Sequence, residues 1–357
     1  MRDFNYAVLK NKKWDNEIIA YIAQIHEHKA KQELFLKQKP QELEKLVEIA
    51  KVQSTESSNE IEGIRTTNTR LKQLVSEKTT PKNRDEEEIA GYRDVLNILH
   101  ESYEYIPIIP NYILQLHKLL YSHSSKAIGG TFKNVQNYIS GTDRNGKNYT
   151  IFTPLSPIET PIAIEKICKE FNNAIAKNDV DPLILIPIFI HDFLCIHPFL
   201  DGNGRMSRLL TTLLLYRCGY LVGKYISLET KIAKTKSLYY DALAQSQIGW
   251  EMGKDNIESF IKYLLGTILS AYRDFEERVS MVSLKVPAIK MVEKAISTII
   301  GKFTKSTIIE LCPSLSAKSI ESALKKLAIE EQIKKCGAGK NTFYIKNDNY
   351  GNYKQKN

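Results

Sequence analysis

The chain has 357 residues, 43% of them hydrophobic and 25% charged, which is enough for two or three domains of a globular protein. Its formal net charge of +9 favours an anionic partner such as a nucleotide, a nucleic acid or an acidic protein, or else a generally basic surface. The five cysteines are scattered, which excludes the paired spacing of a zinc site and is typical of reduced thiols in the cytosol. The N-terminus lacks the apolar segment of a secretory signal, and the most apolar run, 183–196, is too short to cross a bilayer. We therefore expect a cytoplasmic protein with no membrane partner.

The N-terminal part of the chain carries the periodicity of amphipathic helices, with apolar residues recurring three and four positions apart. Pro40 directly precedes the second of these segments, as is common where a helix begins. We expect residues 1–105 to form an N-terminal helical region in a mainly α fold. The helices expected in this part and just beyond it are 15–37, 41–61, 85–104 and 111–122.

Two β-prone segments between Asn134 and Pro154 flank the turn-rich stretch GTDRNGKN. The Asn145-Gly146 pair is typical of a hairpin turn. The sequence therefore predicts a β-hairpin over 134–154, which by itself would be an ordinary surface ribbon.

Helical periodicity returns after the hairpin, and the run 183–196 is predicted to be a buried helix. Residues 197–208, HPFLDGNGRMSR, fall between this helix and the next. They combine a histidine, a carboxylate, two glycines around an asparagine, and two arginines. The helices expected in this part are 158–177, 182–196, 203–218, 229–247 and 256–279.

The pattern of the sequence changes near Lys285, from long helical segments to short elements. A helix, a turn at Pro313, a second helix from about Ala317 and two short strands around GAGKN then follow, which is the order of a winged helix-turn-helix domain over 285–347. The lysines of 317–335 are offset by glutamates, and the segment has no arginine. This charge pattern favours protein docking over DNA reading, although DNA binding stays open.

The segment 197–208 has the residue types of a polyphosphate site. If a helix begins near Gly202, its first N–H groups lack partners within the helix and carry part of a positive charge. Glycine at 202 and at 204 lets a phosphate approach the backbone without a Cβ in the way. Arg205 and Arg208, three positions apart, are expected to project from one face of the first turn. This arrangement suits an anion with more than one phosphate group.

Two further residues of the segment supply chemistry that such an anion would need. Asp201 is a hard oxygen ligand suited to Mg²⁺ shared with phosphate oxygens. His197 has the ordinary pKa of a group that accepts a proton near neutral pH. Singly, each residue would be structural more often than functional. All constrained positions in this order would match by chance about once in 10¹⁰ starting positions, so the cluster as a whole indicates function.

The segment resembles the signature of Fic proteins, HxFx[DE]GNGRxxR, and matches it at every constrained position. The resemblance implies a helical catalytic core, here 106–280, that binds Mg-ATP and transfers AMP to a Ser, Thr or Tyr hydroxyl of a target protein. His197 would be the general base, Asp201 the Mg²⁺ ligand and Arg208 the γ-phosphate ligand. The anion hole would be formed by Gly202, Asn203, Gly204 and Arg205. A phosphotransferase branch of the family has lysine in place of Gly204, so glycine favours adenylyl transfer.

The hairpin region is similar to the flap of Fic proteins in GTFKNVQNYISG and FTP. A flap would offer a strand edge on which an extended target segment pairs, so that its hydroxyl is held in line. Later in the chain, SLYYDAL carries Tyr239 and Tyr240, an aromatic pair that is most often core. Fic relatives place a tyrosine of this neighbourhood against adenine, so both are candidate nucleotide contacts.

A second resemblance lies in SSNEIEGI, where Ser58, Glu62 and Gly63 match the inhibitory motif [ST]xxxE[GN] of many Fic proteins. Without the Fic signature, Ser and Glu four positions apart would be a solvated helix face. The resemblance implies an inhibitory helix at about 41–63, whose Glu62 pairs with Arg208 and occupies the place of the γ phosphate. It places the chain in the Fic class with an N-terminal inhibitory helix, and we expect weak activity of the isolated protein.

Other functions remain open at this stage. Glu62 could place a water molecule that removes AMP from a modified target, which would make the protein a de-AMPylase. The chain could instead be a DNA-binding regulator whose helical domain senses a nucleotide, although a sensor has no need of His197. The sequence also leaves self-modification and a homodimer open.

Overall fold

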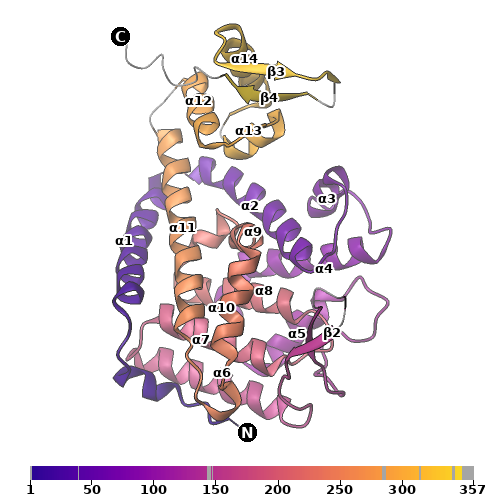
Figure 1. Cartoon of the computed structure of the whole chain (residues 1–357), viewed down its shortest axis with the longest axis vertical. Coiled ribbons are helices and arrows are strands. Elements are labelled where there is room, and N and C mark those ends of the chain that lie inside the picture. Colours follow the sequence, from indigo (N-terminus) through magenta and orange to yellow (C-terminus); the bar gives the residue numbers. More distant parts are fainter. Residues whose placement is uncertain are drawn as a thin grey trace. The chain divides into compact units, whose positions relative to one another are not determined.

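The computed structural model describes residues 2–38, 40–142, 146, 148–283, 287–312, 315–339 and 342–347. The chain divides into two compact units, one made of Met1–Lys31 with Ala50–Tyr272 and the other of Gln32–Ile49 with Arg273–Asn357. Helices make up most of both units, and the sheets of the described residues are two short hairpins (Figure 1). Within the described residues, no helix has the length and apolarity needed to span a membrane.

The first half of the chain is helical, as the sequence predicts. After the short 3-10 helix η1 (Tyr6–Asn11), the helices are α1 (Asn16–Gln38), α2 (Pro40–Ile61), α3 (Asn68–Val75), α4 (Arg84–Ser102) and α5 (Pro110–Leu120). The prediction missed α3, which has only eight residues.

Local sequence signals explain where α4 and α5 begin and how closely they pack. Asn83 caps α4 by accepting a hydrogen bond from the Glu86 N–H, and α5 begins with a proline at its first position. The two helices approach at Gly91, where a Cβ would overlap the carbonyl oxygen of Leu120. Glycine is therefore required at this crossing.

The predicted hairpin is present as β1 (Ile139–Thr142) and β2 (Asn148–Phe152), an antiparallel pair. Ser140 lies opposite Thr150, and the register shifts between Ile139 and Ser140. The strands are shorter than the predicted segment 134–154. Residues 143–145 and 147, including Asn145 of the predicted turn, lie outside the described residues.

Helices α6 (Thr160–Lys177), α7 (Pro182–Ile196) and α8 (Asn203–Arg217) form the centre of the first unit, with α7 in contact with both neighbours. Every residue of α7 after Pro182 is buried, which confirms the predicted buried helix. Helix α8 is buried as well, except at Gly204 and Arg217. The segment 197–208 thus lies between two buried helices, and this fixes its position.

The helix predicted over 229–247 is wrong as a single element. The structure has α9 (Leu228–Lys234) and α10 (Lys236–Gln247), separated at Thr235 with φ −120° and ψ 33°. The Thr235 hydroxyl donates to the Lys231 carbonyl at 2.9 Å, and it also lies 2.8 Å from the Tyr263 hydroxyl. These side-chain contacts compete with continuation of the helix. After α10 comes the long α11 (Glu258–Ser283).

The C-terminal part of the second unit contains α12 (Ala288–Thr298), α13 (Lys305–Leu311), α14 (Ala317–Ile329), β3 (Ile333–Cys336) and β4 (Phe343–Lys346). Its core includes Val292, Ile296, Phe303, Ile308, Ile320, Leu324 and Leu327. The predicted helix from Ala317 and the two strands after it are present, whereas α12 was missed. Pro313, at the predicted turn, lies outside the described residues. The winged-helix assignment and the domain boundaries near 105 and 285 stay predictions.

Candidate active site

His197 directly follows α7 in a conformation that is uncommon for a residue with a side chain. Its φ is +51°, in the left-handed region, and its N–H donates to the Phe193 carbonyl at 2.9 Å. A non-glycine residue in this region needs support from surrounding contacts and is frequent at functional sites. The ring of His197 lines a cavity of about 850 Å³.

The hydrogen bonding of His197 determines which ring nitrogen is free. Nδ1 lies 3.2 Å from the Leu194 carbonyl oxygen, which can only accept, so Nδ1 carries the hydrogen and Nε2 keeps a lone pair. Burial lowers the pKa of His197 to about 4, against a smaller opposite effect of the Leu194 carbonyl. The imidazole is therefore uncharged at neutral pH and can accept a proton at Nε2.

Asn203 closes the loop between α7 and α8. Its Oδ1 accepts the Phe199 N–H at 2.9 Å and its Nδ2 donates to the Phe199 carbonyl at 2.7 Å. The buried side chain is thus fully used by the loop backbone. What Asn203 can offer to an anion is its main-chain N–H, at the first position of α8.

The first turn of α8 is open to an anion. Gly202 precedes it with φ +83°, and no side chain caps the helix. A Cβ at Gly202 would lie 3.0 Å from the Tyr121 hydroxyl, and a Cβ at Gly204 would overlap Oε1 of Glu62. A carboxylate therefore lies against this helix start, where a phosphate is expected to bind.

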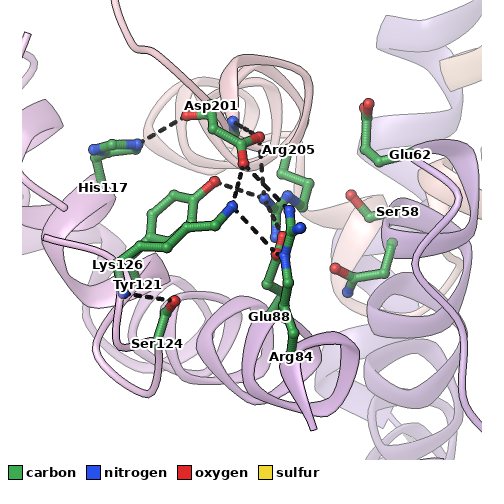
Figure 2. Close-up of polar contacts among 12 residues, drawn as sticks. Ser58, Glu62, Arg84, Glu88, His117, Tyr121, Ser124, Lys126, Asp201 and Arg205 are labelled. Carbon is green, nitrogen blue, oxygen red and sulfur yellow. Dashed lines mark hydrogen bonds and ion pairs between the residues drawn. The ribbon is translucent and has the colours of Figure 1, made fainter. Parts of the chain in front are cut away.

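The two arginines of the segment contact different partners, although both line the cavity. Arg205 is 1% exposed, lies 2.7 Å from Glu88 through Nη2 and donates to the Tyr121 hydroxyl at 2.8 Å (Figure 2). Its Nε and Nη1 atoms are buried without a hydrogen-bond partner among the described residues. Arg208 instead contacts α2. The two guanidinium groups thus line one cavity but are held by different elements, Arg205 by α4 and Tyr121 and Arg208 by α2.

Asp201 lies at the centre of the polar cluster in Figure 2. Its Oδ2 accepts from Lys126 Nζ at 3.0 Å and its Oδ1 accepts from the Gly202 N–H at 2.7 Å. Burial alone would raise the pKa of Asp201, but Lys126 and Arg205 outweigh this effect and lower it. The side chain is 40% exposed, so an ionised carboxylate faces solvent at the cavity.

His117 holds the backbone beside Asp201. Its Nδ1 accepts the Gly130 N–H at 3.0 Å, so Nε2 carries the hydrogen and donates to the Asp201 carbonyl at 3.1 Å. The ring stacks on Phe199 with centroids 3.7 Å apart. Burial lowers the pKa of His117 to about 4, which keeps this arrangement uncharged.

Asp201 is the residue that could hold Mg²⁺. Within the described residues no group of three or more His, Cys, Asp or Glu side chains could bind a metal by itself. Mg²⁺ in nucleotide sites is commonly held by one or two carboxylates together with substrate phosphates and water. One ionised, half-exposed carboxylate beside an open helix start fits that kind of site.

The C-terminal end of α2 binds Arg208. Glu62 Oε1 accepts from Nη2 of Arg208 at 2.8 Å, Ser58 Oγ accepts from Nε at 2.8 Å, and the Ser58 carbonyl accepts from Nη2 at 2.9 Å. Arg208 is 3% exposed and Glu62 33% exposed. The helix ends in a Schellman pattern, with Gly63 at φ +80° and its N–H 3.0 Å from the Glu60 carbonyl. Gly63 thus fixes where Glu62 lies.

The cavity joins these residues to the hairpin and to α10. It is lined by Glu62, His197, Asp201, Arg208, Tyr138, Ser140, Thr150, Tyr239 and Tyr240, among others. Tyr240 is 44% exposed, whereas Tyr239 is 4% exposed and packs against Phe260. A volume of about 850 Å³ is in the range of small-molecule sites.

Residues 107–215 match the family model Fic/DOC family. The chain contains a Fic domain. Solved structures with the same fold include a Fic family protein from Desulfovibrio desulfuricans G20, with a TM-score of 0.61 and 18% identity over 94% of this chain and 98% of that one. A Fic domain containing signaling protein from Bacteroides thetaiotaomicron VPI-5482 has a TM-score of 0.61 and 23% identity over 72% of this chain and 97% of its own. The predicted mainly α Fic-type fold is confirmed.

Curated relatives of the Fic domain are named protein adenylyltransferase Fic. Those from Drosophila grimshawi and Drosophila mojavensis are each 32% identical over 108 residues, which is 30% of this chain. The match spans 20% and 19% of their lengths, so this chain covers about a fifth of the curated relatives it matches.

The sequence did not predict the residues that contact the segment 197–208 from α4 and α5 and from the chain after α5. Glu88, Lys126 and Tyr121 contact Asp201 or Arg205, and His117 was assigned no role. They come from α4, α5 and the segment after α5, far from the signature in the sequence. No spacing rule connects them to it, and only the helix packing brings them together.

Proposed function

We propose that this protein is a protein adenylyltransferase, which transfers AMP from ATP to a hydroxyl side chain of a target protein. The observation that carries the proposal is one cavity that combines an uncharged His197, the open start of α8, the ionised Asp201 and the edge of the hairpin. The names of the curated relatives support the same reaction class.

His197 acts as the general base. Nε2 accepts the proton of the target hydroxyl while the hydroxyl oxygen bonds to the α phosphorus of ATP. The bond from the α phosphorus to the bridging oxygen of the β phosphate breaks, and pyrophosphate leaves. Such a reaction mainly needs in-line positioning and neutralisation of phosphate charge, because the protein forms no covalent bond.

The start of α8 holds the phosphates. The main-chain N–H groups at Gly202, Asn203 and Gly204 donate to phosphate oxygens, and glycine keeps the approach free of side chains. Arg208 binds the γ phosphate once Glu62 has left it. Arg205 also lines the cavity and adds positive charge there through its buried guanidinium.

Asp201 would hold Mg²⁺, which supplies positive charge to the phosphate oxygens when it is bound. Lys126 and Arg205 keep this carboxylate ionised. Tyr240, with its ring exposed in the cavity, is the better candidate for stacking on adenine, and Tyr239 supports it at a centroid distance of 5.3 Å.

The hairpin serves as the flap. Tyr138 and Tyr149 are 60% and 55% exposed and line the cavity together with Ile139, Ser140, Thr150 and Ile151. An extended target segment that pairs with the strand edge would bring a Ser, Thr or Tyr hydroxyl toward His197.

Glu62 inhibits the enzyme by occupying Arg208 and the start of α8. A ligand with the charge of a γ phosphate competes for the same arginine, so the inhibited and ATP-bound states exclude each other. We infer that the protein is weakly active until a partner, a metal or oligomerisation displaces Glu62 from Arg208.

The test is transfer of label from α-labelled ATP to protein, with Mg²⁺ present, by the full chain and its variants. We expect Glu62→Gly to increase labelling of a target or of the protein itself, and His197→Ala to abolish it in that background. A Glu62→Gly protein that binds ATP by calorimetry but labels nothing in a cell lysate would contradict the transferase assignment. Mass spectrometry of labelled proteins would identify the target.

Removal of AMP is a second candidate, because Glu62 lines the same cavity as His197 and could orient a water molecule there. Release of AMP from a modified protein by the unmodified chain, lost in Glu62→Gly, would establish it. For the C-terminal region we propose protein docking. A salt-dependent, sequence-selective gel shift with DNA would contradict that role.

A further inference from the structure

Lys133 is a buried lysine in the segment that leads from α5 to the hairpin. Its side chain is nearly inaccessible, with 3% of the residue exposed. Nζ donates to the Ile196 carbonyl at 2.9 Å and to Oδ1 of Asn137 at 2.9 Å. Its main-chain N–H donates to the Pro198 carbonyl at 2.8 Å. Lys133 therefore contacts the loop on both sides of His197.

Asn137 contacts the two carbonyls of this loop that Lys133 does not contact. Its Nδ2 lies 3.3 Å from the His197 carbonyl oxygen and 3.1 Å from that of Phe199. Together, the two residues donate to all four successive carbonyls from 196 to 199. A left-handed φ of +51° at His197 costs free energy and persists where surrounding contacts fix the backbone. These four bonds are such contacts.

Neutral oxygens are the partners of this ammonium group. Among the described residues Lys133 forms no ion pair, and its hydrogen bonds go to a carbonyl and an amide. Burial lowers the pKa of Lys133 to about 8. A neutral donor could satisfy the same two oxygens without the cost of burying a charge. Support of the loop does not by itself explain why residue 133 carries a charge.

We propose that Lys133 is a positioning residue for His197, which fixes, with Asn137, the backbone of the loop that carries the base. The proposal rests on the proposed function, since it assigns His197 the role of base. It also couples the segment before the flap to the base, because residues 133 and 137 lie just ahead of β1.

The charge of Lys133 gives the proposal a second consequence. Lys133 disfavours the protonated imidazole and lowers the pKa of His197, whereas Glu62 at the end of α2 raises it. The other charged groups that line the cavity are Asp201, Arg205, Arg208 and Asp241, and Tyr239 and Tyr240 face it from α10. Loss of Lys133 should therefore raise the pKa of His197, so that the base becomes protonated at a higher pH than before.

The experiment uses the full chain with Glu62→Gly, so that labelling can be measured. Into it we would introduce Lys133→Met, Lys133→Gln, Lys133→Arg and Asn137→Ala. The pKa of His197 is read by NMR of ¹³C-labelled histidine, assigned with His197→Ala, and the rate of label transfer is followed from about pH 3 to 9, so that the range includes the pKa of about 4. ATP binding is measured by calorimetry.

We expect both neutral variants to raise the pKa of His197 and to move the acidic limb of the rate profile to higher pH. Lys133→Arg keeps the positive charge, so its rate profile should match that of the parent. Asn137→Ala keeps the charge, so it should slow transfer by at least about tenfold at every pH with unchanged ATP affinity, as expected for a misplaced base.

Two results would overturn the proposal. One is an unchanged His197 pKa and profile in the folded neutral variants, with only a lower melting temperature. The other, decisive even if both neutral variants fail to fold, is an Asn137→Ala protein that transfers label at the parent rate. Absence of transfer in the parent would refute the proposed function, while the NMR measurement would still test the effect of the charge.

Discussion

Replacing Glu62 by glycine tests the contact between α2 and Arg208 most directly. The variant removes one charge-assisted hydrogen bond of 2.8 Å from a buried guanidinium. Hydrogen bonds to charged groups are worth about 1.5–3 kcal/mol. Because the Glu62 side chain is 33% exposed, screening by solvent reduces this to about 1–2 kcal/mol. If ATP must displace that contact, its apparent Kd should fall about 5–30-fold in the variant.

Calorimetric titration of Mg-ATP into the full chain measures this change. The matched control is Glu60→Gly, which removes a carboxylate from the same helix end. Glu60 contacts the exposed Arg65 at 3.0 Å and not Arg208. We expect the control to bind ATP as the unmodified chain does. Equal ATP affinity in all three proteins would refute the idea that Glu62 occupies the phosphate site.

Three other variants test separate parts of the structure. Gly204→Ala places a methyl group where Oε1 of Glu62 lies, so the contact between Glu62 and Arg208 should break. The ATP affinity should nevertheless not rise as it does in Glu62→Gly, because the methyl group fills the space that a phosphate would need. Calorimetry measures the ATP affinity. If Gly204→Ala bound ATP as tightly as Glu62→Gly does, the phosphate would not bind at Gly204. Lys126→Met frees Asp201 from an ion pair worth less than about 1 kcal/mol, so Mn²⁺ binding with ATP, followed by EPR, should tighten up to about fivefold. An unchanged Mn²⁺ affinity would count against Asp201 as a metal ligand. Glu86→Gln removes the ion pair between α3 and α4, which lowers the pKa of Glu86 to about 2 from 4.5. The stabilisation is complete above pH 4.5 and lost as the pH falls toward 2, so the two melting temperatures should differ at pH 7 and converge in acid. A constant difference would contradict this.

The sequence predicts the helices that have clear periodicity and end signals. The bounds of α7 were predicted to the residue, because Pro182 marks its start and an unbroken apolar run follows. The signature 197–208 could be recognised because its residues are contiguous. Short or interrupted elements escaped: α3 has eight residues, and the break at Thr235 depends on a contact with Tyr263 that no local pattern encodes.

The same distinction applies to the candidate site. The sequence places Arg205 four residues after Asp201 but cannot show that its guanidinium pairs with Glu88 of α4. Burial decides this, since the guanidinium needs a carboxylate partner that only the packing of α4 supplies. The sequence did not single out Lys133, because a lone lysine before a hairpin is usually on the surface.

Ser58 explains why loss of Glu62 should leave an ordered site. Three of the contacts of Arg208 come from the end of α2, and two of them are to Ser58, through its hydroxyl and its carbonyl. Displacement of the Glu62 side chain alone keeps both Ser58 contacts, so Arg208 stays fixed beside the start of α8 and can bind a phosphate. Displacement of the whole helix end would also remove Ser58 and leave a buried arginine unpaired, at a cost that a bound phosphate would have to offset. Movement of one side chain, rather than of α2, is therefore the less costly route from the proposed inhibited state to the nucleotide-bound state.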